Sequence, residues 1–346
     1  MACADEHFDL AICTGRFPLP GEAALALVRA CLARAPRCLL VLRRAFMAPT
    51  PANPLRWDER AALLRDALAD DERDAVRIEP LREHWDEARL LRDVRELAAT
   101  HAPSRVLWLH AGEAPLQLEE PPAGWVVEPT GGDDGDAVAT RALHALYEAD
   151  DAAVALRALL PGVAAGAAGF LRAWIREDRF ATVRDDWRQI AKERRQWSVA
   201  PYPVVLSTVD ALVRARDRVL LVRRGRSPGK GLWAIPGGFL EPSEGVLHAA
   251  LRELEEETRL PLTRQQKKQA LRAMRVFDHP ERSQRGRMIT HGFYFDLGDI
   301  APPAVEGADD AAEAKWFPIA QLSQLEDQLH DDHFHILQTF LGFLKD

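Results

Sequence analysis

Short apolar runs alternate with amphipathic stretches along the first part of the chain, and this alternation restricts the fold more than any other feature. Apolar runs of strand length lie at residues 8–13, 38–42, 106–110 and 125–129. Patterns typical of amphipathic helices lie between them, at residues 22–35, 57–68 and 86–99. Strands that alternate with helices favour a parallel sheet with both faces covered. We therefore expect a doubly wound, Rossmann-like α/β domain over residues 1–160.

The pattern changes towards residue 200. A stretch rich in Arg, Asp and Trp occupies residues 164–197, so residues 161–200 are predicted to form a helical linker. VAPYP at 199–203 is the expected boundary.

Beyond that boundary, strands and helices are distributed differently. VVLSTVDALV and RVLLVRR predict an antiparallel hairpin. Further strands are expected at residues 287–297 and 314–319, and a terminal helix over residues 321–344. With a helix following Gly238, these elements predict an α/β/α sandwich over residues 201–346.

Charge and composition narrow the classes of function. The chain has 346 residues and a formal net charge of -8, which argues against a nucleic-acid-coating role. Its N-terminus lacks the basic start and apolar run of a secretory signal. Arg157 and Pro161 interrupt the apolar run at 152–171, which argues against a membrane span. We expect a cytoplasmic protein with reduced, buried thiols at Cys3, Cys13, Cys31 and Cys38.

The strongest functional signal is a spaced set of residues in GGFLEPSEGVLHAALRELEEETRL. Glu253, Glu256 and Glu257 stand at i, i+3 and i+4, which places three carboxylates on one face of a helix. Oxygen ligands of this kind suit magnesium or manganese. Pro236, Gly237 and Gly238 permit a tight turn close to a ligand, and the carbonyl of Gly237 is a further candidate ligand. The alternative for any Glu triplet alone is the solvated face of an amphipathic helix.

The complete spacing resembles the Nudix box, the signature of hydrolases that act on nucleoside diphosphates linked to another moiety. Its members here are Gly238, Glu244, Arg252, Glu253, Glu256 and Glu257. One position departs from the box: Arg259 stands where that pattern has a glycine, which is expected to help the chain leave the helix. The departure threatens local geometry more than metal chemistry.

The whole chain resembles a bifunctional family in which a nicotinamide mononucleotide adenylyltransferase domain precedes a Nudix hydrolase. TGRFPLPGEAALALV, LREHWDEARLLRDVREL and RVFDHPERSQRGRMITH carry this resemblance. In that family Gly-Arg-Phe leads into His-x-Gly-His, which binds ATP phosphates. Gly15, Arg16 and Phe17 are kept, but Gly21 and Ala24 stand at the two histidine positions.

A second phosphate-binding element of the family also differs here. Its Ile-Ser-x-Thr-x-x-Arg pattern corresponds to GDAVATR, where Asp136 and Val138 replace hydroxyl residues and Arg141 is kept. Alanine carries no proton to a phosphate, and an aspartate repels one. The first domain is therefore expected to be a degenerate transferase that serves as scaffold, dimerisation surface or relic ligand-binding domain. Arg16 and Arg141 are equally explained as surface cations.

The resemblance implies a substrate and roles for the second domain. It implies ADP-ribose, cleaved to AMP and ribose 5-phosphate, and a homodimer. Arg282, Arg285 and Arg287 are candidates for gripping the diphosphate, although a solvated basic turn explains them equally. Phe277, Phe293 and Trp316 are candidates for stacking on adenine, with core packing as the alternative.

In the expected mechanism, Glu253 and Glu257 hold magnesium, and Arg252 orients the carboxylates. Glu256 is a ligand or the base. Acidic residues on a later loop compete with it for the role of base, namely Glu306, Asp309 and Asp310. His333 and His335 are interpreted as capping or packing residues rather than metal ligands.

Three other functions stay open on the sequence. The hydrolase domain has another nucleoside diphosphate derivative as its substrate, or it senses ADP-ribose without turnover, or the first domain still makes NAD. A substrate panel, a binding assay and an adenylyltransferase assay separate them.

Overall fold

The computed structural model describes residues 7–111, 121–130, 134–164 and 166–344. The chain forms two compact units, residues 1–184 and 185–346, and each is described by itself. Cys3 lies outside the described residues. No helix in the described part of the chain has the length and apolar character needed to cross a membrane.

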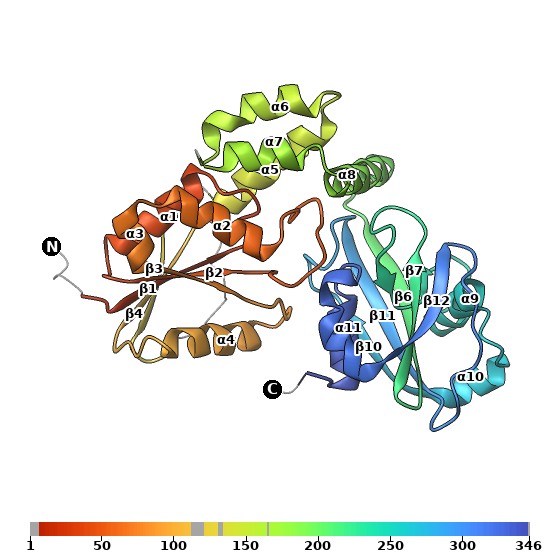
Figure 1. The fold of residues 1–346 in the computed structure, drawn as a ribbon. Coiled ribbons are helices and arrows are strands. Elements are labelled where there is room, and N and C mark those ends of the chain that lie inside the picture. Colours follow the sequence, from red (N-terminus) through yellow and green to blue (C-terminus); the bar gives the residue numbers. More distant parts are fainter. Residues whose placement is uncertain (1–6, 112–120, 131–133, 165, 345–346) are drawn as a thin grey trace. The chain divides into compact units, whose positions relative to one another are not determined.

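The first unit is built around a five-stranded parallel sheet of order β3-β2-β1-β4-β5 (Figure 1). Its strands are β1 Leu10–Gly15, β2 Cys38–Leu42, β3 Val76–Pro80, β4 Val106–His110 and β5 Trp125–Pro129. Four of them lie where apolar runs predict them. The sequence prediction missed β3, because Arg77 and Glu79 interrupt its apolar side chains.

Helices cover both faces of this sheet, which confirms the doubly wound α/β expectation. The helices up to residue 197 are α1 Glu22–Leu32, α2 Trp57–Ala67, α3 Asp70–Ala75, α4 Glu87–Ala99, α5 Gly135–Glu148, α6 Ala152–Leu159, α7 Ala167–Trp174 and α8 Asp178–Trp197, with a 3-10 turn η1 at Leu160–Gly162. One apolar core packs α1 and α2 on the sheet, and a second packs α4 on the opposite face (Figure 1).

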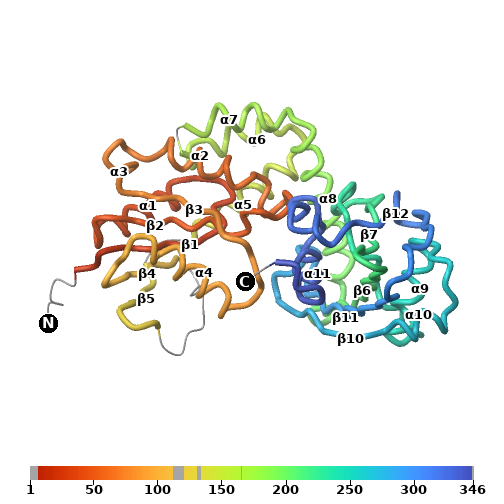
Figure 2. The backbone as a smooth tube through the Cα atoms, turned by 60° about the horizontal axis from the view of Figure 1, so that its bottom comes forward, coloured from red at the N-terminus to blue at the C-terminus, as the bar shows by residue number. Residues whose placement is uncertain are grey.

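The second unit contains a mixed seven-stranded sheet with helices on both sides, as the α/β/α prediction requires. Its main path runs β10-β11-β6-β7-β12, with β8 paired to β7 and β9 to β6. The strands are β6 Val205–Ala215, β7 Arg218–Arg224, β8 Trp233–Ala234, β9 Gly237–Phe239, β10 Leu271–Phe277, β11 Arg287–Asp296 and β12 Ala311–Pro318. Helix α9, Val246–Thr258, and helix α11, His333–Leu341, lie on opposite sides of β6 and β7 (Figure 2).

The end of the chain differs from the single helix expected over residues 321–344. Two 3-10 turns, η2 Ile319–Gln324 and η3 Glu326–Gln328, precede α11. Asp331 has a positive φ of 43°, which interrupts helical geometry just before α11 begins. A short helix α10, Arg264–Ala270, was also absent from the prediction.

The two compact units divide inside α8 rather than at the expected boundary of 199–203. Side chains of the second half of this helix contact the second unit. Glu193 accepts a hydrogen bond from Arg285 at 2.7 Å, and Asp186 accepts one from the amide of Gly229 at 3.0 Å. The helix expected as a linker therefore contributes part of the second unit.

Candidate active site

The two glycines at the start of the motif lie in strand β9, which pairs antiparallel with β6. A Cβ atom at Gly237 would overlap the carbonyl oxygen of Val209, and one at Gly238 would overlap the carboxylate of Glu253. Neither glycine has a positive φ. The sequence interpretation as a tight turn is therefore wrong, since these positions need glycine for close approach between strand and helix.

Helix α9 ends in the geometry that the motif glycine would supply. Arg259 adopts the left-handed conformation, with φ 47° and ψ 33°, and its amide donates to the carbonyl of Glu255. The following loop covers the helix end, because the amide of Glu306 donates to Thr258 at 3.0 Å and that of Ala308 donates to Glu257 at 3.1 Å. The departure from the box thus leaves the helix exit intact, and Arg259 carries the strain.

Arg252 connects four parts of the site. Its guanidinium donates to both oxygens of Glu244, at 2.6 and 3.1 Å, and to Glu253 and Glu256 at 2.9 Å each. It also donates to the carbonyl of Phe239 at 3.3 Å. These bonds, above all those with Glu244, raise the pKa of Arg252, so it remains a cation. The predicted orienting role of Arg252 agrees with this geometry.

Glu257 is the most enclosed of the three helix carboxylates. It accepts a hydrogen bond from the amide of Gly237 at 3.0 Å, and burial raises its pKa to about 8. Burial also raises the pKa of Glu253. In the described part of the chain, the three carboxylates do not bring ligand atoms within 4.8 Å of one another, and Arg252 instead binds two of them.

The donor set still fits a hard divalent cation. All three carboxylates line one cavity of about 560 Å³, together with Gly237. The close approach of Gly238 holds the carboxylate of Glu253 against β9, and a cation there would neutralise the buried charge of Glu257. The residues present therefore suit magnesium or manganese.

The three predicted arginines lie in different surroundings. Arg282 is 5% exposed and forms a bidentate ion pair with Asp332, at 2.7 and 2.9 Å, in the cavity wall. Arg285 lines the cavity, is held by Glu193, and lies 4.7 Å from the ring centre of Phe239. Arg287 donates to the carbonyl of Asp278 and is not among the residues that line the cavity.

The acidic candidates for a base also separate. Asp309 and Asp310 line the cavity, and Asp310 pairs with Arg226 at 2.8 Å. Glu306 lies outside the lining and pairs with Arg259 at 3.3 Å. Asp210 on β6 lines the cavity and was missed, although a carboxylate within an apolar strand is a visible signal; burial raises its pKa to about 7.

The aromatic candidates belong to the core rather than the cavity. Phe293 and Phe277 are buried in two apolar clusters, and Trp316 donates from its indole nitrogen to the carbonyl of Pro303 at 2.8 Å. Phe239, which stands inside the motif, does line the cavity, but it is not among the stacking candidates predicted from the sequence.

The two histidines of the last helix have packing contacts. His333 accepts from the amide of Ile235 at 2.8 Å, and His335 lies edge-on to Phe277 with ring centres 6.0 Å apart. The contact of His335 is one of packing, as interpreted from the sequence, whereas His333 also lines the cavity.

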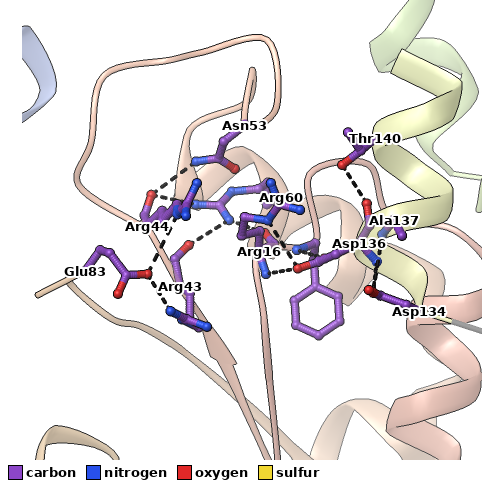
Figure 3. Close-up of polar contacts among 11 residues, drawn as sticks. Arg16, Arg43, Arg44, Asn53, Arg60, Glu83, Asp134, Asp136, Ala137 and Thr140 are labelled. Atoms are coloured by element: carbon purple, nitrogen blue, oxygen red, sulfur yellow. Dashed lines mark hydrogen bonds and ion pairs between the residues drawn. The ribbon is translucent and has the colours of Figure 1, made fainter. Parts of the chain in front are cut away.

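Side chains of the first unit form hydrogen bonds with the backbone of the loop after β1 (Figure 3). Asp136, in the first turn of α5, accepts hydrogen bonds from the amides of Arg16 and Phe17 at 2.7 Å each. Its carboxylate also lies 3.5 Å from the Arg16 side chain. Arg60, fully buried, donates to the carbonyls of Arg16, Arg43 and Arg44. Asp136 and Arg60 therefore lie at the carboxyl ends of β1 and β2, where sheets of this kind usually bind ligands.

The positions expected to carry histidines leave little room for them. A Cβ atom at Gly21 would lie 2.7 Å from the carbonyl oxygen of Gly162, because Gly21 is bridged to Val163. Ala24, on α1, is 5% exposed and packs in the core between this helix and the sheet.

Val138, at one of the expected hydroxyl positions, is exposed on α5.

Comparisons with known proteins match the second unit to the Nudix domain. The NUDIX domain model matches residues 205–340. An ADP-ribose pyrophosphatase of Methanocaldococcus jannaschii is 31% identical over 157 residues, which cover 44% of this chain and 83% of that protein. The ADPR responsive transcriptional repressor NtrR of Acinetobacter baylyi is 28% identical over 156 residues, 43% of this chain and 58% of the repressor.

A solved structure matches both units together. It is a bifunctional NMN adenylyltransferase/ADP ribose pyrophosphatase from Francisella tularensis, complexed with AMP and a Mn ion. The match has a TM-score of 0.85 and 26% identity, and covers 97% of this chain and 99% of that one.

Proposed function

The chain belongs to the Nudix hydrolase family, in the form that joins an NMN adenylyltransferase-like domain to a Nudix domain, and we propose that it is a magnesium-dependent ADP-ribose pyrophosphatase. Its products are AMP and ribose 5-phosphate. The observation that carries the proposal is the fit of Gly238 against Glu253, which sets the motif carboxylates in one cavity with Gly237.

Four groups of this chain would hold the cation: the carboxylates of Glu253, Glu256 and Glu257 and the carbonyl of Gly237. When bound, magnesium supplies a polarised phosphoryl oxygen, a water of lowered pKa and neutralisation of the developing charge. Arg252 sets the directions of Glu253 and Glu256 through hydrogen bonds of 2.9 Å. Arg252 is therefore a positioning residue.

The part of the cavity wall that we propose faces the substrate contains Arg282, Arg285 and Phe239. Arg285 faces the cavity and is steadied by Glu193 and Phe239, which leaves part of its guanidinium to meet a diphosphate oxygen. Arg282 supports this wall through Asp332. Glu256 is the leading base, and Asp309 and Asp310 are the alternatives in the same cavity.

The test is turnover by the purified full chain. With magnesium and ADP-ribose, AMP and ribose 5-phosphate should accumulate in equal amounts, and a chelator should abolish the reaction. A panel of other nucleoside diphosphate derivatives defines the preference. Cleavage of a different member at a higher kcat/KM would correct the substrate while keeping the hydrolase.

A sensor of ADP-ribose is the second candidate, and the similarity to the repressor NtrR is the observation in its favour. The presence of Glu253, Glu256 and Glu257 in one cavity favours turnover instead. Tight binding of ADP-ribose with no product over hours would establish the sensor.

The first domain is proposed to be a degenerate transferase. Asp136 supplies a carboxylate where the loop amides of Arg16 and Phe17 would otherwise be available to a phosphate. Gly21 and Ala24 provide no proton donor beside it. Incubation with nicotinamide mononucleotide and ATP should give no NAD, from the wild type or from Asp136→Ser. Formation of NAD by the wild type while the hydrolase works would show an active transferase.

A further inference from the structure

Three cysteines from separate elements meet inside the first unit. Cys13 lies on β1, Cys31 in the last turn of α1, and Cys38 at the start of β2. The sulfurs of Cys13 and Cys38 are 4.0 Å apart, and all three sulfurs lie within 4.8 Å of one another. In the described part of the chain, this is the one group of at least three His, Cys, Asp or Glu side chains whose ligand atoms gather so closely.

The surroundings of this thiol cluster are apolar. Cys13 and Cys31 are fully buried and Cys38 is 1% exposed, within the core formed by the sheet, α1 and α2. All three are free thiols. The thiols of Cys13 and Cys38 are hydrogen-bonded to each other, and the ligand atoms that gather in the cluster are all sulfurs.

The spacing suits an ion at the centre of the cluster. An ion equidistant from three sulfurs that are 4.0 Å apart lies about 2.3 Å from each, which is an ordinary metal–thiolate distance. The other two sulfur–sulfur distances are at most 4.8 Å, so each needs to shorten by less than an ångström to reach 4.0 Å.

The number and softness of the ligands select the class of ion. Sulfur-only donors favour soft ions over magnesium or manganese, and structural zinc sites almost always have a fourth ligand. Of the soft ions that thiolate ligands select, copper(I) is the one that three sulfurs satisfy without a fourth ligand.

We propose that Cys13, Cys31 and Cys38 form a binding site for one soft monovalent cation, copper(I). Each sulfur that binds the ion releases its proton to solvent, and no oxidation state changes. Since the sulfurs are buried, uptake requires transient opening of α1, and the bound ion then ties α1 to β1 and β2. The site is independent of the proposed hydrolase, which lies in the other unit.

The test uses the full chain, isolated under anaerobic conditions from cells grown with added copper, and separately loaded over hours with copper(I) buffered by a competing chelator. The wild type should hold one copper per chain, with a near-ultraviolet sulfur-to-copper charge-transfer absorption and a raised melting temperature. Cys3→Ser, the matched control at a cysteine that is not among the three proposed ligands, should behave like the wild type.

Cys31→Ala should lose the copper and the absorption band while keeping ADP-ribose turnover and its circular dichroism. Cys13→Ala and Cys38→Ala serve where Cys31→Ala does not fold. Copper retained by all three variants, no copper in the wild type by either route, or zinc bound as tightly as copper(I) would overturn the proposal.

Discussion

At the scale of the residue, Arg259 shows how a motif position tolerates a departure. The conformation is kept with φ 47°, although an L-residue there is strained by about 1–2 kcal/mol. Its side chain forms an exposed ion pair with Glu306, which adds little stability. The function of the motif glycine is thus conformational at this site.

Arg259→Gly should raise the free energy of unfolding by about 0.5–1 kcal/mol, because relief of the left-handed strain exceeds the entropy that glycine adds to the unfolded chain. Denaturant unfolding measures the change. Arg259→Ala is the control, which removes the same side chain without relieving the strain and should give no gain. Equal gains from both variants would contradict the explanation.

Arg282 offers a second test at the residue scale, because its partner Asp332 is buried. Burial raises the pKa of Asp332 to about 6, above the ordinary 3.8, so this carboxyl favours folding in its protonated form and disfavours it as pH rises. Arg282→Ala should lower the free energy of unfolding by about 3–5 kcal/mol at pH 8, where an unpaired carboxylate remains buried. The loss should be smaller at pH 5.

Unfolding titrations of the wild type and Arg282→Ala at both pH values provide the measurement. The double variant Arg282→Met with Asp332→Leu is the control, since it removes both charges and should recover most of the stability. A loss that is the same at pH 5 and pH 8 would show that the charge of Asp332 is not responsible.

At the scale of the element, the meeting of β9 with α9 decides whether the carboxylates reach the cavity. The helix and the spacing of Glu253, Glu256 and Glu257 could be predicted from the sequence, because both follow from local periodicity. The need for two glycines without side chains could not, since it arises from contacts with Val209 and Glu253, which belong to other elements. The ion pairs of Arg282 and Arg285 escaped prediction for the same reason.

Gly238→Ala and Gly237→Ala should therefore fail in different ways. The new methyl group at 238 meets the movable carboxylate of Glu253, so kcat/KM should fall by roughly 100-fold, by analogy with the loss of one preorganised electrostatic group, while stability changes little. At 237 it meets backbone, so the free energy of unfolding should fall by about 1–3 kcal/mol. Kinetics and denaturant unfolding of both variants distinguish them; a stable, fully active Gly238→Ala would contradict this account.

At the scale of the whole molecule, the two compact units differ in the groups that they bring together. In the second unit, Glu253, Glu256 and Glu257 line one cavity, and Arg252 donates hydrogen bonds to the first two. In the first unit, Asp136 accepts hydrogen bonds from two amides of the loop after β1, and Gly21 and Ala24 stand where the family resemblance leads us to expect histidines. The alternation of strands and helices predicted the first fold, and strands that flank two helices predicted the second. The division inside α8 instead depends on side-chain contacts such as Glu193 with Arg285.

The most direct measurement compares magnesium-dependent release of AMP from ADP-ribose by the wild type, Glu256→Gln and Glu255→Gln. Glu255 stands on the same helix, but its side chain is 71% exposed and pairs with Lys267, so it is the matched control. The account predicts that Glu256→Gln lowers kcat by at least about 100-fold, as expected for loss of a metal ligand or base, and that Glu255→Gln stays within about twofold. No AMP from the wild type, or equal rates for Glu256→Gln and the wild type, would contradict it.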